Sequence, residues 1–259
     1  MTILETTANR APLGLLCTDS VSGAAVSDGL VVTAWPAGNP EAARTPVPSP
    51  VSAVLVFGRL PGLTGTVLAN DPHSPQWPAA SLAFEVRVTD LLGRYLPELM
   101  LVTVTGGTLA TPLLYSAPAR PAPAGFAAVS GEVWSTVTSG PVAWAVVKIT
   151  SDIATYLTLT DQLGRYVAYF PDPEALPPLT GSPPSAAAGQ LSWPLTVSVQ
   201  YQPSGQHQLA DAGPSDPPEL GSLLGQGAAP ISAGGGTQDD LAATLVFGSP
   251  LLLMLEVAA

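Results

Sequence analysis

Two nearly identical segments determine how this chain folds. Residues 89–95 are Thr-Asp-Leu-Leu-Gly-Arg-Tyr, and residues 160–166 are Thr-Asp-Gln-Leu-Gly-Arg-Tyr. Six of the seven positions match, at an offset of 71 residues. Each copy follows a run typical of a β-strand, residues 84–88 in the first case and 156–159 in the second. The sequence therefore predicts the same hairpin turn twice, in two similar structural units.

The chemistry of the repeat is that of a turn. Its aspartate can accept hydrogen bonds from backbone N–H groups two residues on, and its glycine can adopt a positive φ. The tyrosine then begins the return strand and can pack inward. The arginine could bind an acidic partner or a C-terminal carboxylate, but pairing with the aspartate of its own turn is favoured, because a structural turn recurs with its fold. These turn residues are Asp90, Gly93, Arg94 and Tyr95 in the first copy and Asp161, Gly164, Arg165 and Tyr166 in the second.

The rest of the chain predicts an all-β protein. Helical periodicity is nearly absent, and short alternating or β-branched runs are separated by proline and glycine. We expect two prealbumin-like or immunoglobulin-like β-sandwich domains, at residues 1–115 and 116–259. The second domain contains a Pro/Gly-rich loop or tether at 202–240 and an apolar C-terminal segment at 241–257. Spaced prolines in residues 116–125 predict an extended linker.

The motifs also stand in a recognisable order. Residues 139–142, Ser-Gly-Pro-Val, precede the alternating strand 145–149 and then the second copy of the repeat. Residues 22–26, Ser-Gly-Ala-Ala-Val, precede the strand 30–34 in the same way. This succession resembles the carboxypeptidase regulatory-like domain. The resemblance implies a prealbumin-like β-sandwich without catalytic residues of its own.

A second resemblance comes from the paired arrangement. The string 84–97 is followed by Leu-Tyr-Ser-Ala-Pro-Ala-Arg-Pro at 114–121, by 143–147, and by the second turn, which leads to Phe-Pro-Asp-Pro-Glu at 170–174. This order resembles small two-domain accessory proteins of phage-tail-like contractile injection particles. It implies a role inside a multi-protein assembly.

Composition excludes several classes of function. Only 10% of the 259 residues are charged, and 8 Lys plus Arg against 19 Asp plus Glu give a net charge of −11. We therefore expect neither nucleic acid nor an anionic membrane surface as a partner. There is no apolar run of 18 residues, so we expect no membrane insertion. The first ten residues lack a basic signal-peptide start, which predicts a cytoplasmic protein or one inside a particle released from the cell.

No catalytic, cofactor or metal site is predicted. His73 and His207 lie in loop-like sequence, and there is no Gly-x-Ser-x-Gly motif. The single cysteine, Cys17, excludes an internal disulfide and is expected in the core. Asp239-Asp240 lacks the spacing of a calcium loop. We expect no enzyme activity and no small-molecule substrate.

Two features predict contact with a partner protein. Trp77 lies in the loop-like sequence Pro-Gln-Trp-Pro at 75–78 and is the aromatic residue best placed for contact. The C-terminal segment could complete the sheet of a neighbouring subunit, because edge strands with few charges invite pairing. Its candidate contact residues are Leu251, Leu252, Leu253, Met254 and Leu255. Lys148 is the only lysine available to protect an edge.

The sequence thus predicts a non-enzymatic structural subunit of a larger protein assembly. The specific expectation is a baseplate, cage or collar component of a contractile phage-tail-like injection particle, with other subunits or copies of itself as partners. The alternative is a surface adhesion or carbohydrate-binding β-sandwich module. The sequence leaves open whether residues 202–240 are ordered, and whether the C-terminal segment packs within its own chain or on a neighbour.

Overall fold

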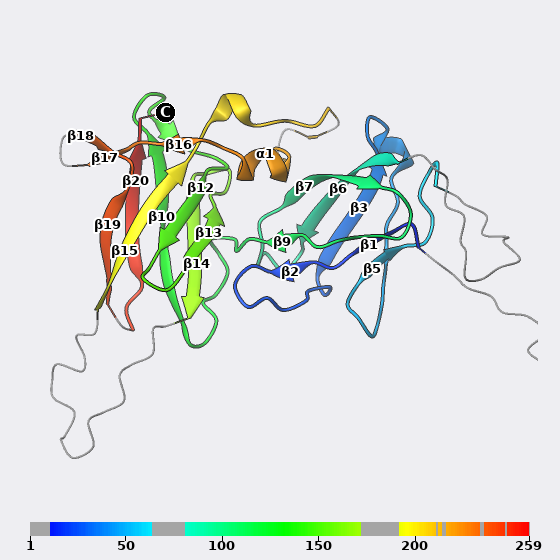
Figure 1. The fold of residues 1–259 in the computed structure, drawn as a ribbon, viewed down its shortest axis with the longest axis horizontal. Helices are drawn as coiled ribbons and strands as arrows, with labels where there is room; N and C mark the ends of the chain where they lie inside the picture. The colour runs from blue at the N-terminus through cyan, green and yellow to red at the C-terminus, as the bar shows by residue number, and fades with distance from the viewer. Residues whose placement is uncertain are drawn as a thin grey trace, which may run out of the picture. The chain divides into compact units, whose positions relative to one another are not determined.

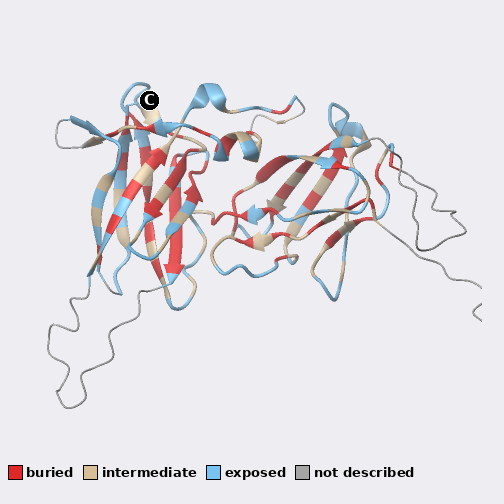
Figure 2. Cartoon of the chain, in the orientation of Figure 1, coloured by how far each residue is buried: buried red, intermediate tan, exposed pale blue. Residues whose placement is uncertain are grey.

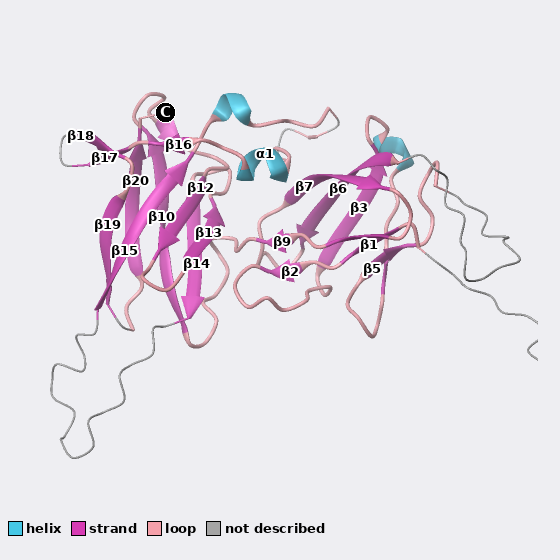
Figure 3. Cartoon of the chain, in the orientation of Figure 1, coloured by secondary structure: helices cyan, strands magenta, loops and turns pink. Residues whose placement is uncertain are grey.

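The computed structural model describes residues 11–63, 81–171, 192–210, 212–213, 216–233, 236–246 and 248–258. In these residues the regular secondary structure is almost entirely β-strand, as Figure 3 shows. Trp77 and His73 lie outside the described residues. The chain divides into two compact units, which we describe separately. Both are β-sandwiches, so the expected all-β fold is confirmed.

The two units are made from interleaved segments. Unit 1 comprises Met1–Leu92, Pro97–Leu114 and Gln208–Gly221. Unit 2 comprises Gly93–Leu96, Tyr115–His207 and Ser222–Ala259. This division differs from a single boundary at residue 115, because residues 208–221 belong to unit 1 and residues 93–96 to unit 2.

Unit 1 is built from three sheets (Figure 1). The four-stranded sheet has the order β4-β5-β1-β8, the three-stranded sheet the order β3-β6-β7, and β2 pairs with β9. The elements are β1 Leu13–Leu15, β2 Thr18–Asp19, β3 Leu30–Pro36, the 3-10 helix η1 Pro40–Ala42, β4 Val47–Pro48, β5 Leu55–Phe57, β6 Leu82–Asp90, β7 Glu98–Val104, β8 Thr108–Ala110 and β9 Leu113–Leu114.

The core of unit 1 follows from alternation along its strands. Successive side chains of a strand point to opposite faces of the sheet, so every second residue can be buried. Figure 2 shows this alternation as buried positions separated by more exposed ones. Both main sheets contribute fully buried side chains, among them Leu13, Leu15, Phe57, Phe84, Val86 and Val88.

Unit 2 is a sandwich of two larger sheets. One has the order β11-β10-β20-β17-β18, with β14 also paired to β10; the other has the order β13-β12-β15-β16, with β19 also paired to β15. The elements are β10 Phe126–Ser135, β11 Gly140–Pro141, β12 Val146–Thr150, β13 Thr155–Leu159, β14 Arg165–Pro171, β15 Ser192–Gln200, η3 Pro203–Gly205, α1 Leu220–Leu224, β16 Ala228–Ala229, β17 Ile231–Ala233, β18 Gly236–Gln238, β19 Leu241–Val246 and β20 Leu251–Val257. Helix α1 includes residues of both units.

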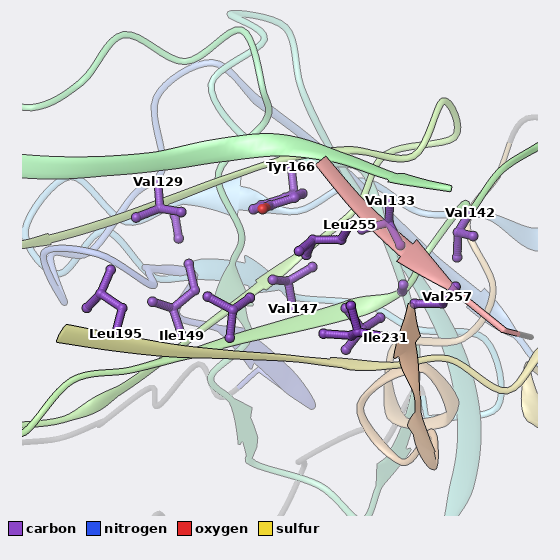
Figure 4. Packing of buried hydrophobic residues seen from close by; sticks show 14 of the residues in the cluster. Val129, Val133, Val142, Val147, Ile149, Tyr166, Leu195, Ile231, Leu255 and Val257 are labelled. Carbon is purple, nitrogen blue, oxygen red and sulfur yellow. The ribbon is translucent and has the colours of Figure 1, made fainter. Parts of the chain in front are cut away.

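The core of unit 2 lies between these sheets. Figure 4 shows Val129 and Val133 of β10 facing Val147 and Ile149 of β12, with Leu255 of β20 packed beside them. Strand β10 alternates regularly between buried and partly exposed positions up to its end. Every second residue of β10 therefore helps to hold the two sheets together.

The region 202–240 is not simply a tether. Its described residues include η3, α1 and three short strands, and Leu223, Ala229 and Ile231 are buried. Gln226 is also buried and joins several parts of unit 2: its Oε1 accepts from the backbone N–H of Gln202 at 3.0 Å, and its Nε2 donates to the Trp144 carbonyl at 2.8 Å. This stretch is rich in proline and glycine, but it also contains a few apolar residues. Leu223, Ala229 and Ile231 are far enough apart that each anchors a different short element, α1, β16 and β17.

The segment after Tyr115 is also packed rather than a free linker. Arg120 donates to the Ser116 hydroxyl at 2.9 Å, and the Tyr169 hydroxyl donates to the Arg120 carbonyl. The Arg120 guanidinium lies over the Tyr95 ring, 4.9 Å from its centroid. Its cation–π contacts hold the beginning of this segment on unit 2.

Candidate interaction edge

The C-terminal strand β20 forms part of its own unit. It pairs in parallel with β10 over seven positions, from Val129 opposite Leu251 to Ser135 opposite Val257. On its other side a single pair is formed, between Ile231 and Val257. Among the described residues, Leu251–Glu256 of β20 therefore form no strand pair on that side; we call Leu251–Glu256 the β20 edge. The C-terminal segment therefore packs within its own chain, one of the two alternatives that the sequence left open.

The backbone N–H and C=O groups of successive β20 residues point alternately toward and away from β10. The Val257 carbonyl accepts from the Thr136 N–H at 2.9 Å, on the β10 side. The next residue, Ala258, donates to the Pro230 carbonyl on the opposite side. Because alternate residues of a strand direct their backbone groups to opposite sides, those of Leu252, Met254 and Glu256 point away from β10. Leu252 and Met254 thus offer donors and acceptors that a further strand could use, whereas the Glu256 carbonyl faces β17 next to the Ile231–Val257 bridge.

The same alternation separates the side chains of β20. Leu255 and Val257 are buried in the sandwich core, so Leu255, a candidate contact residue, is not accessible to a partner in this structure. Leu252 and Met254 are 70% and 61% exposed on the opposite face. Trp134, opposite Glu256 in the register, shares that outer face and is 40% exposed. Residues of β20 thus combine outward-directed backbone groups with exposed apolar side chains.

The edge lacks the usual protection against pairing. Strand β19 pairs with β15 and is the neighbouring edge of the other sheet. Glu256 is the only charged residue in β19 and β20. Lys148 lies on β12, between β13 and β15, and therefore protects no edge here. Native edges are commonly blocked by lysine, proline or bulges, so an uncharged stretch of this length is prone to pair with another strand.

The second copy of the repeat forms a self-contained turn. One Asp161 carboxylate oxygen, Oδ1, accepts from the backbone N–H of Leu163 at 2.8 Å and of Arg165 at 2.9 Å. The other, Oδ2, accepts from Arg165 Nε at 2.9 Å and Nη2 at 2.7 Å. Gly164 has φ +74°, and a Cβ there would lie 2.7 Å from the Val133 carbonyl oxygen. Asp161 and Arg165 are therefore used within the turn.

Tyr166 joins this turn to the β20 edge. It is buried, which raises the pKa of its hydroxyl, and that hydroxyl donates to the Leu253 carbonyl at 3.4 Å. Gly131 lies between Tyr166 and Leu253 in the register of the sheet. A Cβ on Gly131 would be 1.7 Å from the Leu253 carbonyl oxygen. Glycine at this position thus allows β20 to lie close against β10.

The first copy of the repeat also has the contacts of a turn. The Asp90 carboxylate accepts from the Leu92 N–H at 3.3 Å, and Gly93 has φ +66°. The Arg94 guanidinium lies over the ring of the buried Tyr95, 5.3 Å from its centroid. The aspartate and the glycine therefore have the same roles in both copies.

The other candidates do not form a chemical centre with these residues. His207 is exposed, and its backbone N–H donates to the Ser222 hydroxyl. Cys17 is buried; desolvation, with a smaller contribution from the nearby Glu98 carboxylate, raises the pKa of its thiol to about 12. In the part of the chain that the structure describes, no group of three His, Cys, Asp or Glu side chains is arranged to hold a metal ion. Nor does any described helix have the length and apolar character needed to cross a membrane.

Sequence reasoning missed a polar cluster in unit 1. Trp35 Nε1 donates to Glu85 at 3.0 Å, the Arg87 guanidinium lies over the Trp35 ring, and Arg87 pairs with Asp216. The alternation of β6 assigns Glu85 to an outer face, yet Glu85 is buried. Leu209, which packs with Trp35 and Leu99, was the available signal, since it is an apolar residue within a polar stretch.

Comparisons with known proteins identify no family. No protein-family model matches the chain, and no curated protein sequence is similar to it. Among solved structures, the TIE protein of Bacillus anthracis aligns at 9% identity and a TM-score of 0.27, over 95% of this chain and 33% of that one. The shaft pilin SpaA of Lactobacillus rhamnosus GG aligns at 10% identity and a TM-score of 0.25, over 95% of this chain and 97% of the pilin. A streptococcal ancillary pilin aligns at 9% identity and a TM-score of 0.22, with 95% and 61% of the two chains covered.

These likenesses are too distant to transfer a role. This chain spans a third of the TIE protein's length and 61% of the ancillary pilin's.

Proposed function

We propose that this protein is a non-enzymatic structural subunit of a larger protein assembly, which it joins through the β20 edge. The observation that carries the proposal is the coincidence, on one strand, of outward-directed backbone groups with exposed Leu252 and Met254 side chains. An incoming strand would gain backbone hydrogen bonds and bury apolar surface at the same place.

The free energy of burying the apolar side chains exceeds the cost of removing charges from water at this edge. Burying a leucine or methionine side chain fully contributes roughly 1.5–3 kcal/mol, and Leu252 and Met254 are both mostly exposed. The opposing cost of removing charges from water is small, because β19 and β20 contain Glu256 as their only charged residue. Covering this edge therefore favours the bound state.

The particular assembly we propose is a contractile phage-tail-like injection particle, with this chain in its baseplate, cage or collar. Support for this finer proposal comes from the order of motifs between residues 84 and 174, which resembles accessory proteins of such particles. The two turn motifs have structural contacts in both copies, which agrees with a packing role for the repeat.

The test is incorporation into a particle. The tagged full-length chain should cosediment with a high-mass particle from its source cells, and electron microscopy should show its shape. Leu252→Lys should reduce incorporation at least tenfold, because a charge would be placed on the pairing edge. Ile153→Lys is the matched control, because Ile153 is 73% exposed and lies in the turn between β12 and β13.

Two results would overturn the proposal. One is a chain that sediments alone at its own mass in every fraction. The other is equal incorporation of the two lysine variants, which would show that the β20 edge is not the attachment site. A particle of tail-like shape would support the finer proposal, whereas a surface fibre or sugar-dependent retention would replace it with the adhesion alternative.

A further inference from the structure

We infer that the partner at the β20 edge is a second copy of this chain, with the two β20 strands paired antiparallel about a twofold axis at Leu253. The inference rests on the proposed function, because it uses the same edge as the attachment site. It adds the identity of the strand that pairs there. Such a pair would join the β10-containing sheets of two copies into one continuous sheet.

Charge selects the occupant. The chain carries a net charge of −11, so two copies repel one another over most orientations. The β20 edge contains one charged residue, Glu256, and therefore offers little to a basic or an acidic partner. An uncharged apolar strand fits best, and β20 is itself such a strand. A contact of this edge with itself brings copies together where few charges meet.

The alternation of the backbone restricts the register. In an antiparallel pair, residues that direct their backbone groups toward the partner lie opposite one another. Leu252, Met254 and Glu256 are the outward residues, so Leu252 can lie opposite Leu252, Met254 or Glu256 of the other copy. The register is thereby reduced to a few discrete choices.

Apolar contact and charge decide among these choices. Placing Leu252 opposite Met254 pairs the two exposed apolar side chains twice, once on each side of the axis. Placing it opposite Glu256 would put a carboxylate against leucine. Placing it opposite Leu252 would put Met254 beside Pro250, which lacks a backbone N–H. The first arrangement places Pro250 only opposite Glu256, at the two ends of the pair, and so holds the two Glu256 side chains apart.

Cysteine cross-linking reads this register directly. Residues opposite one another in a hydrogen-bonded pair have Cα atoms about 5.5 Å apart, which suits a disulfide. We expect a mixture of Leu252→Cys chains and Met254→Cys chains to form a covalent dimer under mild oxidation. Each variant alone should cross-link at least tenfold less, because its own cysteines would be roughly 8 Å apart, two residues out of register. The native Cys17 is buried and does not compete.

Sedimentation equilibrium supplies a second measurement. The unmodified chain should show a dimer, Leu252→Lys should be monomeric, and Ile153→Lys should remain dimeric. The inference is overturned if the unmodified chain is monomeric up to about 100 μM, about a hundred times a typical micromolar dissociation constant. It is also overturned if all cysteine combinations cross-link equally, since that shows unspecific apolar association.

The two proposals fail separately. A monomeric chain whose incorporation into a particle still depends on Leu252 would leave the proposed function intact and assign the edge to a different subunit. A dimer with the predicted cross-linking pattern that joins no larger particle would support the inference and overturn the proposed function.

Discussion

The outer sheet face of unit 1 is covered, whereas the outer face at the β20 edge of unit 2 is exposed. In unit 1, the outer side chains of β3 and β6 include Trp35 and Glu85, and both are buried. In unit 2, Leu252 and Met254 occupy outer positions and are mostly exposed. Alternation within the strand looks alike in both cases. The difference arises because Leu209 and Asp216, from far along the chain, contact Trp35 and Arg87 on the outer face of unit 1.

That covering segment has both apolar and polar contacts. Leu209 packs with Trp35 and Leu99, and Glu219 forms an isolated parallel bridge with Leu99. Asp216 supplies a carboxylate to Arg87 and also accepts the Gly213 N–H at 2.7 Å. The outer face of β6 carries the cation Arg87, and the covering segment supplies the carboxylate of Asp216 that pairs with it. The β20 edge has no charge of its own to match except Glu256, which is why we assign it an uncharged strand.

The largest expected effect tests how β20 is held in unit 2. Gly131→Ala should lower the free energy of unfolding by about 3 kcal/mol or more, because the added methyl group overlaps the Leu253 carbonyl and β20 must move away from β10. Urea denaturation of the full chain measures this loss. Dimer formation should weaken as well, since the paired strand is displaced.

Gly140→Ala is the matched control for that experiment. Gly140 lies on β11 in the same sheet, and a Cβ there would meet no atom closer than 3.8 Å. We expect a change within about 1 kcal/mol. Equal losses in the two variants would show that the close approach of β20 to Gly131 is not what stabilises this sheet.

The next effect concerns the cover of unit 1. Leu209→Ala should cost about 2 kcal/mol, because it removes a buried side chain from between Trp35 and Leu99. Tryptophan fluorescence should shift to the red as water reaches Trp35. Val47→Ala, at an exposed position of unit 1, should change neither quantity measurably. No shift in the Leu209 variant would mean that this segment does not shield the sheet.

A smaller effect isolates the charge match. Asp216→Asn should cost about 1 kcal/mol, because Arg87 loses a charged partner in a partly exposed position. The loss should shrink in 1 M salt, where surface attraction is screened. Asp152→Asn, at an exposed turn of unit 2, is the control for a change in net charge alone. An equal loss of stability in both variants would show that the Arg87–Asp216 pair does not stabilise unit 1.

Local features of the fold could be predicted because their causes are local. Asp161 and Gly164 stand where a turn needs an acceptor and a positive φ, and the repeat made that turn visible twice. The position of the Arg94 guanidinium over the Tyr95 ring could not be predicted, because it depends on how the fold places that ring.

Most of the features that could not be predicted from the sequence depend on contacts between distant segments. Trp35, which donates to the buried Glu85, packs against Leu209, a residue more than a hundred positions away, and no pattern in β6 indicates this contact. The close packing of β20 on β10 requires that residue 131 have no side chain, but the sequence does not distinguish Gly131 from any other glycine in a strand. The apolar character of residues 251–255 was plain in the sequence, but only the register shows which side chains remain exposed.

An effect of pH separates the cover of unit 1 from its core. Burial raises the pKa of the Cys17 thiol from 9.0 to about 12, so the folded state keeps a proton that the unfolded state releases. This contribution to stability is fully present below pH 9 and is lost as the pH rises from 9 toward 12. The free energy of unfolding should therefore fall faster between pH 8 and 10.5 in the unmodified chain than in Cys17→Ala. Equal slopes would mean that the thiol is already open to water. In Leu209→Ala the steeper slope should persist, because removing a cover from the outer face leaves the inward-facing Cys17 enclosed.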